Sequence, residues 1–175
     1  MTTAAILRRV STSLVTNPDC ARVLAGAVVM AAHFERFAQV AVLRPVLVRR
    51  RSKEVAALGN VLLVCAPGCD SIMVGENLAA ALAAGNRVAI SLAGVPDQLM
   101  RLLFELLFGV FATERFSVLS DACPWTISSA ELSIVVLTSS RAFLNERPWI
   151  AQAQAPEEFT PTADLLRFYS ALREA

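Results

Sequence analysis

Four cysteines and a single histidine are the side chains of this 175-residue sequence that could act as nucleophiles or soft metal ligands. Cys65 and Cys69 flank a Pro-Gly pair, whereas Cys20 and Cys123 lie far from them along the chain. These spacings form neither a paired metal motif nor a dense disulfide framework, and a zinc site would need nearly every soft ligand to converge. We therefore predict no metal site, cysteines that pack as small buried apolar side chains, and a reducing compartment.

The lone histidine, His33, lies between Ala32 and Phe34 in an apolar segment. Triad catalysis would require a histidine that an acid orients and that reaches a nucleophile, but Glu35 points to a different helix face. The sequence contains no Gly-x-Ser-x-Gly, Gly-x-Gly-x-x-Gly or phosphate-loop motif. We expect a structural histidine, and an independent enzyme is the least favoured function.

The residues from Gly59 to Leu92 have the pattern of a complete strand–helix–strand unit. A short β-branched run, a Pro-Gly break, a segment of strong helix formers and a Gly-Asn stop follow one another before a second apolar run. The pattern predicts, in order, a strand at Val61–Cys65, a helix at Asp70–Ala84 and a parallel strand at Arg87–Leu92.

The remaining segments extend this unit to an α/β fold, a Rossmann-like parallel sheet with helices on both faces. The predicted strands lie near residues 61–65, 87–92, 116–119 and 132–138, and the predicted long helices are Asp19–Val42, capped by Asn17 and ended by Arg44-Pro45, and Asp97–Phe111. We also expect an extended connection at Val46–Arg50, a short helical piece from Arg141, and a last helix that Thr162 caps.

Three parts are expected in the chain: an N-terminal extension at residues 1–18, an α/β domain at 19–150, and a linker with a C-terminal helix at 151–175. The extension has the composition of a mitochondrial transit peptide, and equally that of a short basic helix. The C-terminal helix either packs back on the sheet or docks on another chain.

Two stretches resemble the aldehyde dehydrogenase superfamily. Leu78 to Ile90, Leu-Ala-Ala-Ala-Leu-Ala-Ala-Gly-Asn-Arg-Val-Ala-Ile, resembles the helix-to-strand passage of that family's cofactor-binding domain, and the match extends back to Val61. Ile134 to Ser140, Ile-Val-Val-Leu-Thr-Ser-Ser, resembles the later strand that enters the family's Phe-Thr-Gly-Ser turn. The resemblance implies the fold of that cofactor-binding domain, here in degenerate form.

Departures from the family's pattern fall on the positions that would hold the cofactor or the reacting group. The family's Pro-Trp-Asn turn falls on Ala66-Pro67-Gly68, so the amide that helps hold the oxyanion is absent. The ribose-binding lysine falls on Ser91, the following acid on Gly94, and the first glycine of the phosphate-facing turn on Ser139. We predict no tight NAD or NADP binding and no catalytic residue, with any residual cofactor site around Pro67, Gly68, Ser91 and Ser139.

Composition points to a protein partner or a homo-oligomer. The chain is 55% hydrophobic and only 18% charged, more apolar surface than one small domain is expected to hide. A net charge of +1 offers no field for nucleic acid, and the one basic cluster, Arg49 to Lys53, has no interleaved aromatic residues. Charged residues interrupt each apolar run, so we expect no transmembrane segment.

Two functions remain open. In the first, the chain is a non-catalytic pseudoenzyme that serves as a structural or interaction subunit of a larger assembly and needs no cofactor. In the second, it is the cofactor-domain half of a split NAD(P)-dependent aldehyde dehydrogenase or acyl reductase, whose catalytic cysteine lies on another chain. The expected location is the cytoplasm, with the mitochondrial matrix as the alternative.

Overall fold

A computed structural model of the chain describes residues 1–48, 53–112, 114–119, 132–139, 142–144, 147–148, 165–166 and 168–174. Its centre is a six-stranded sheet in the order β4-β3-β2-β5-β6-β7. The first four of these are parallel, and they are β4 (Phe116–Val118), β3 (Arg87–Leu92), β2 (Asn60–Cys65) and β5 (Leu132–Leu137). The predicted α/β fold with four parallel strands is therefore confirmed.

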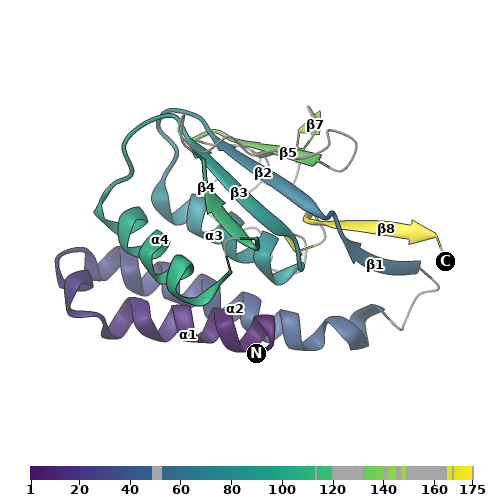
Figure 1. Ribbon diagram of the computed structural model, residues 1–175, viewed down its shortest axis with the longest axis horizontal. Coiled ribbons are helices and arrows are strands. Elements are labelled where there is room, and N and C mark those ends of the chain that lie inside the picture. The colour runs from purple at the N-terminus through teal and green to yellow at the C-terminus, as the bar shows by residue number, and fades with distance from the viewer. Residues whose placement is uncertain are drawn as a thin grey trace.

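The described helices form two layers on one face of this sheet (Figure 1). α3 (Ser71–Ala83) connects β2 to β3, and α4 (Gln98–Val110) connects β3 to β4, so both lie directly on the sheet. α1 (Thr3–Thr16) and α2 (Leu24–Val48) form the outer layer. The segment 120–131, which returns the chain from β4 to β5, lies outside the described residues, so helices on the second face stay a prediction.

Local signals explain where the two inner helices begin and end. The carboxylate of Asp70 accepts a hydrogen bond from the Ile72 N–H at 2.8 Å, and Asp97 accepts one from the Met100 N–H at 2.8 Å. Such caps satisfy backbone donors that the first helical turn leaves without partners. Gly85, with φ of 90°, ends α3 in the left-handed conformation, as its residue type predicted.

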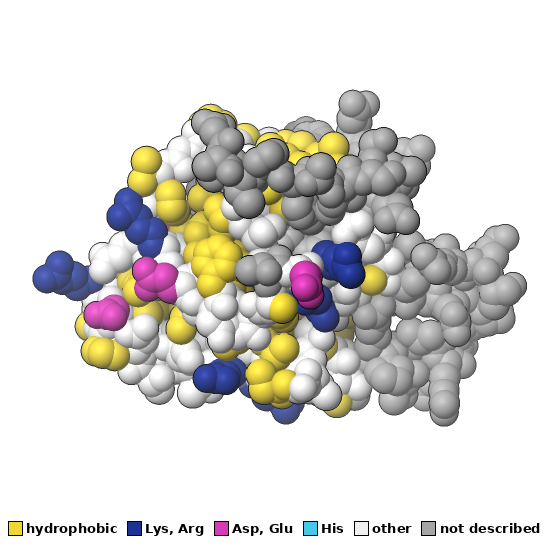
Figure 2. Space-filling model, in the orientation of Figure 1, with side chains coloured by type: hydrophobic (Ala, Val, Ile, Leu, Met, Phe, Trp, Pro, Cys, Tyr) yellow, Lys and Arg dark blue, Asp and Glu magenta, His cyan; other side chains and the backbone are white. Residues whose placement is uncertain are grey.

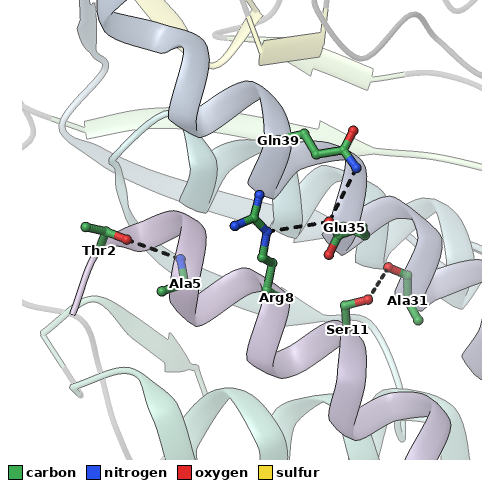
Figure 3. Close-up of polar contacts among 7 residues, drawn as sticks. All are labelled: Thr2, Ala5, Arg8, Ser11, Ala31, Glu35 and Gln39. Atoms are coloured by element: carbon green, nitrogen blue, oxygen red, sulfur yellow. Dashed lines mark hydrogen bonds and ion pairs between the residues drawn. The ribbon is translucent and has the colours of Figure 1, made fainter.

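The N-terminal residues pack into the same core as the rest of the domain. Leu7, Val10 and Leu14 of α1 are buried in it. At the surface of this helix pair, Ser11 Oγ donates to the Ala31 carbonyl at 2.9 Å, and Arg8 Nε lies 3.5 Å from a Glu35 carboxylate oxygen (Figure 3). A transit role for residues 1–18 stays a prediction, and in the folded domain α1 contributes buried side chains to the core.

The start of α2 follows the predicted signal in a modified form. Asn17 caps a 3-10 helix, η1 (Pro18–Val23), by accepting from the Asp19 N–H at 2.9 Å, and the α-helix follows from Leu24. By length and composition alone, Pro18–Val42 could cross a membrane, and 39% of an 18-residue apolar window within it is buried here. Core helices pass the same test, and Met30, Phe34 and Phe37 of α2 are buried in the core.

Three predictions of secondary structure are wrong, two of them between residues 44 and 148 and one in the C-terminal segment. α2 continues through Arg44-Pro45 to Val48, where a helix was expected to end and an extended connection to begin. Pro45 has no N–H to donate to the Ala41 carbonyl, so α2 lacks that hydrogen bond, but the helix continues past it. The residues after Arg141 form a strand, β6 (Ala142–Leu144), antiparallel to β5, followed by β7 (Arg147–Pro148).

The C-terminal segment is the third correction. Only residues 165–166 and 168 are described as helical, and the chain then enters β8 (Ser170–Glu174). This strand pairs antiparallel with β1 (Lys53–Ala57) in a separate two-stranded sheet. The composition of β8 favours a helix, but the free backbone of β1 provides a ladder that overrides local propensity.

Two buried asparagines fix the C-terminal segment to the domain. Asn86 Nδ2 donates to the Ala81 carbonyl at 3.1 Å and to the Tyr169 carbonyl at 2.9 Å, while its Oδ1 accepts from the Gly59 N–H at 3.0 Å. The Tyr169 hydroxyl donates to Asn77 Oδ1 at 2.8 Å. Of the two alternatives for this segment, the structure therefore shows Tyr169 packed back on the domain.

Candidate functional site

A pocket of about 320 Å³ lies at the carboxyl ends of β2 and β3. Its walls are the loop from β2 to α3 and the loop from β3 to α4, with the first turns of both helices beneath. The lining residues most relevant to chemistry are Cys65, Pro67, Gly68, Cys69, Ser71 and Asp97. Open α/β sheets bind their ligands at this edge, because the loops that follow neighbouring parallel strands converge there.

Both helix N-termini at the pocket already hold a carboxylate. Asp70 caps α3 and Asp97 caps α4. Ser71 Oγ also donates to Asp97 Oδ2 at 2.5 Å, which connects the first turn of one helix to the cap of the other. Helix N-termini favour anions, and here the protein's own carboxylates take that position. The pocket is therefore a poor place for a phosphate.

The two cysteines of the pocket are poor nucleophiles. Burial, together with the neighbouring Cys69, raises the pKa of the Cys65 thiol to about 12. Burial also raises the pKa of Cys69, against the opposing effect of a hydrogen bond from the backbone at Ala66, and the Cys69 thiol donates to the Leu137 carbonyl at 3.0 Å. Because the thiolate is the reactive form, neither residue is prepared for attack at neutral pH. Cys20 is buried as predicted, and Cys123 lies outside the described residues.

The four residues predicted for a residual cofactor site do not converge on one pocket. Pro67 and Gly68 line it, and Gly68 has φ of 81°, a conformation that favours glycine. Ser91 precedes Leu92, a lining residue, on β3, so its side chain points to the opposite face of the sheet. Ser139 is exposed, two residues beyond the end of β5. Whether any of these residues contacts a cofactor stays a prediction.

The turn at Ser139 also lacks the setting that phosphate binding needs. The resemblance placed a phosphate-facing turn there, and such turns work because a helix N-terminus follows them. In this chain residues 142–144 form the antiparallel strand β6 instead. A strand supplies no comparable dipole.

His33 has a partner that sequence reasoning missed. Its Nδ1 lies 3.1 Å from a carboxylate oxygen of Glu76 on α3, and both side chains are buried. Arg36 Nη2 lies 3.3 Å from the same ring nitrogen. Glu76 is the one charged residue of α3, and that isolated charge in a mostly apolar helix was the available signal for it. None of the three residues lines the pocket, and among the described residues no three His, Cys, Asp or Glu side chains could hold a metal ion together.

Comparison with solved structures connects this fold to a known one. A betaine aldehyde dehydrogenase from Staphylococcus aureus, a double mutant solved in complex with NAD+, aligns with 67% of this chain at a TM-score of 0.52 and 14% identity. The chain has an aldehyde-dehydrogenase-like fold. It spans 28% of the length of that enzyme, so the aldehyde-dehydrogenase-like part corresponds to a fragment of the larger chain.

A second solved structure is a Burkholderia cenocepacia protein assigned as an aldehyde dehydrogenase, with 18% identity over 77% of this chain and 29% of its own. Its TM-score of 0.45 does not by itself establish a shared fold. No protein-family model matches the sequence, and no similar curated protein was found. At these identities the aldehyde-dehydrogenase-like assignment is one of fold, and activity must be argued from the site.

Proposed function

We propose that this chain is a non-catalytic aldehyde-dehydrogenase-like domain that serves as a structural or interaction subunit of a larger assembly. The observation that carries the proposal is that the chain's own carboxylates cap both helix N-termini at the carboxyl edge of the sheet. There, Asp70 and Asp97 cap the two helix N-termini, and the nearest thiol, Cys65, has a pKa of about 12. A dinucleotide needs an open anion site at this edge, and thiol chemistry needs a thiolate.

The second candidate is the cofactor-domain half of a split NAD(P)-dependent aldehyde dehydrogenase or acyl reductase. One observation favours it: the pocket of about 320 Å³ stands open at the edge of the sheet where α/β proteins bind ligands. In this arrangement another chain would contribute the nucleophilic cysteine. Its weakness is that the cofactor side would still have to accept a pyrophosphate next to Asp97.

Calorimetric titration of the full chain with NAD and with NADP tests the two functions against each other. The proposal expects no binding at micromolar concentrations. A matched pair of variants, Asp70→Asn and Asp97→Asn, removes the two negative charges, and asparagine caps a helix about as well as aspartate. If the carboxylates exclude phosphate, inorganic pyrophosphate should bind the double variant more tightly than the wild type.

Co-purification supplies the complementary measurement. A partner that carries a cysteine-bearing catalytic domain, together with NAD binding by the complex, would favour the split enzyme and overturn the proposal. A stoichiometric partner without such a domain supports the subunit role. We place that assembly in the cytoplasm, and fractionation of cells that express the tagged chain would distinguish this from the mitochondrial matrix.

A further inference from the structure

The strand β4 forms one edge of the six-stranded sheet. Its inner side bonds to β3, since the Arg115 carbonyl accepts from the Val88 N–H at 2.9 Å and the Leu119 N–H donates to the Ile90 carbonyl at 2.7 Å. Backbone groups alternate in direction along a parallel strand, so those of Phe116 and Val118 point outward. Beyond the bond from the Phe116 N–H to Ala112, no described residue pairs with this outer side.

An aromatic cluster on α4 lies beside this free edge. Phe108 is 49% exposed, and its ring centroid is 5.2 Å from that of Phe116, which is buried. Phe104 continues the cluster inward, 5.9 Å from Phe116. Figure 2 shows hydrophobic side chains gathered over the region of α4 and β4. A half-exposed phenylalanine on an aromatic cluster is a typical anchor point for an incoming apolar side chain.

Arg115, at the entrance to β4, carries a charge for which the described residues provide no ion-pair partner. Its Nε and Nη2 are shielded from water without a hydrogen-bond acceptor, while its Cζ lies 5.8 Å from the centroid of the Phe111 ring. Shielded donors of a charged group are costly when they have no partner. The residue as a whole is only partly buried, and Nη1 is not among the shielded atoms, so Nη1 is the guanidinium donor that an acceptor arriving from outside meets first.

We propose that these features form one docking surface, the β4 edge, defined by the outer side of Phe116–Val118 together with Phe108 and Arg115. Its occupant is an extended acidic segment of a partner protein, which adds a strand to β4 and places a carboxylate on Arg115. Strand addition obtains affinity from backbone hydrogen bonds and selectivity from alternate side chains. The inference rests on the proposed interaction role and names the surface that performs it.

The charge selects the partner. A second copy of the chain fits this edge less well, because two β4 strands paired about a two-fold axis bring two Arg115 side chains into one small interface. Residues 116–118 contain no carboxylate to set against them. Like charges in paired strands oppose association, whereas an acidic residue in a foreign strand favours it.

Selection of random seven-residue peptides on phage against the full chain tests the surface. We expect alternating β-branched or aromatic residues with one acidic position. The best peptide is then synthesised with glutamate and with glutamine at that position, and binding is followed by fluorescence anisotropy. Glutamate should bind about tenfold or more tightly than glutamine, the gain expected from one charge-assisted hydrogen bond.

Three variants separate docking from folding. Arg115→Gln should reduce binding of the glutamate peptide about tenfold and leave the glutamine peptide unchanged, whereas a merely structural arginine would affect both equally. Val118→Pro removes an outward N–H, which edge strands tolerate, and should abolish binding of both peptides. Arg101→Gln, the same charge change in the first turns of α4, should alter neither.

Several results would overturn the inference. They are the absence of any enriched peptide, equal losses for both peptides in Arg115→Gln, or a wild-type dimer in light scattering that Val118→Pro converts to monomer. Failure of the proposed function is separately visible, because micromolar NAD binding would contradict it while leaving the peptide results intact. Conversely, a natural partner that binds the Val118→Pro chain as tightly as the wild type would show that the β4 edge is not the docking surface. The proposed subunit role would be unaffected by that result.

Discussion

Replacement of Asn86 by aspartate should destabilise the domain far more than its near-identical shape suggests. The Asn86 side chain is fully buried, donates to two carbonyl oxygens, of Ala81 and Tyr169, and accepts from the Gly59 N–H. Aspartate can still accept from Gly59, and the Ala81 carbonyl keeps the backbone N–H of residue 86 as a donor at 3.2 Å. The Tyr169 carbonyl loses the side-chain donor, and a buried charge is set beside both carbonyls. We expect a loss of about 3–5 kcal/mol in the free energy of unfolding, as for other uncompensated buried charges.

Urea unfolding followed by circular dichroism measures this change, and hydrogen exchange locates it. The matched control is Asn17→Asp, in which an exposed helix cap is replaced by an equally good one, so less than about 0.5 kcal/mol should be lost. In the Asn86 variant, exchange should rise first in the amides of β8, because one of the two hydrogen bonds that hold Tyr169 to the domain is lost and the bond to Asn77 alone remains. If both variants unfold at the same urea concentration, the buried network does not hold the C-terminal segment.

Three further predictions concern other parts of the chain. The Cys65 thiol should resist iodoacetamide at pH 8 longer than Cys69, and equal labelling of the two in mass spectrometry would contradict the burial. Burial raises the pKa of Cys65 from 9.0 to about 12 in the folded chain. The free energy of unfolding should therefore fall as pH rises through that interval. Leu7→Ala should lower the free energy of unfolding by about 2–5 kcal/mol, whereas Val15→Ala, at an exposed position of the same helix, should lower it little. Arg115→Met should raise the melting temperature of the isolated chain in calorimetry by removing donors without partners, and a lowered value would mean that the arginine is already satisfied.

The strand–helix–strand unit could be predicted because its signals are local. A β-branched run, an aspartate cap and a left-handed glycine act within a few residues of where they stand, and β2, α3 and β3 were therefore found nearly to the residue. The same reasoning placed α4 behind the Asp97 cap. The pocket at the ends of β2 and β3 follows from that order of elements, since parallel strands with crossover helices must end at one common edge.

Features that depend on distant contacts were missed. β8 has a helical composition and becomes a strand only because β1 offers it a partner more than 100 residues away in sequence. Glu76 and His33 lie 43 positions apart and meet only when α2 packs on α3. Ser91 was grouped with Pro67 and Gly68 because the family resemblance places the ribose-binding lysine there; one-residue alternation along β3 directs its side chain to the face opposite Leu92, and whether it contacts a cofactor stays a prediction.

The apolar excess of the sequence is resolved in part within the chain itself. α2 appeared to need an external partner, because few polar residues interrupt its circumference. In the folded domain α1 covers one side of it and α3 another, so Met30, Phe34 and Phe37 are buried without help. The case for a partner therefore moves away from overall composition and to specific surfaces, and it is strongest where exposed apolar area coincides with unused hydrogen-bonding groups. One surface among the described residues meets that condition: it combines Phe108, the outer side of β4 and the Arg115 guanidinium. Exposed residues on α2, such as Leu24 and Val28, also offer apolar area, but on a helix whose backbone groups are already paired.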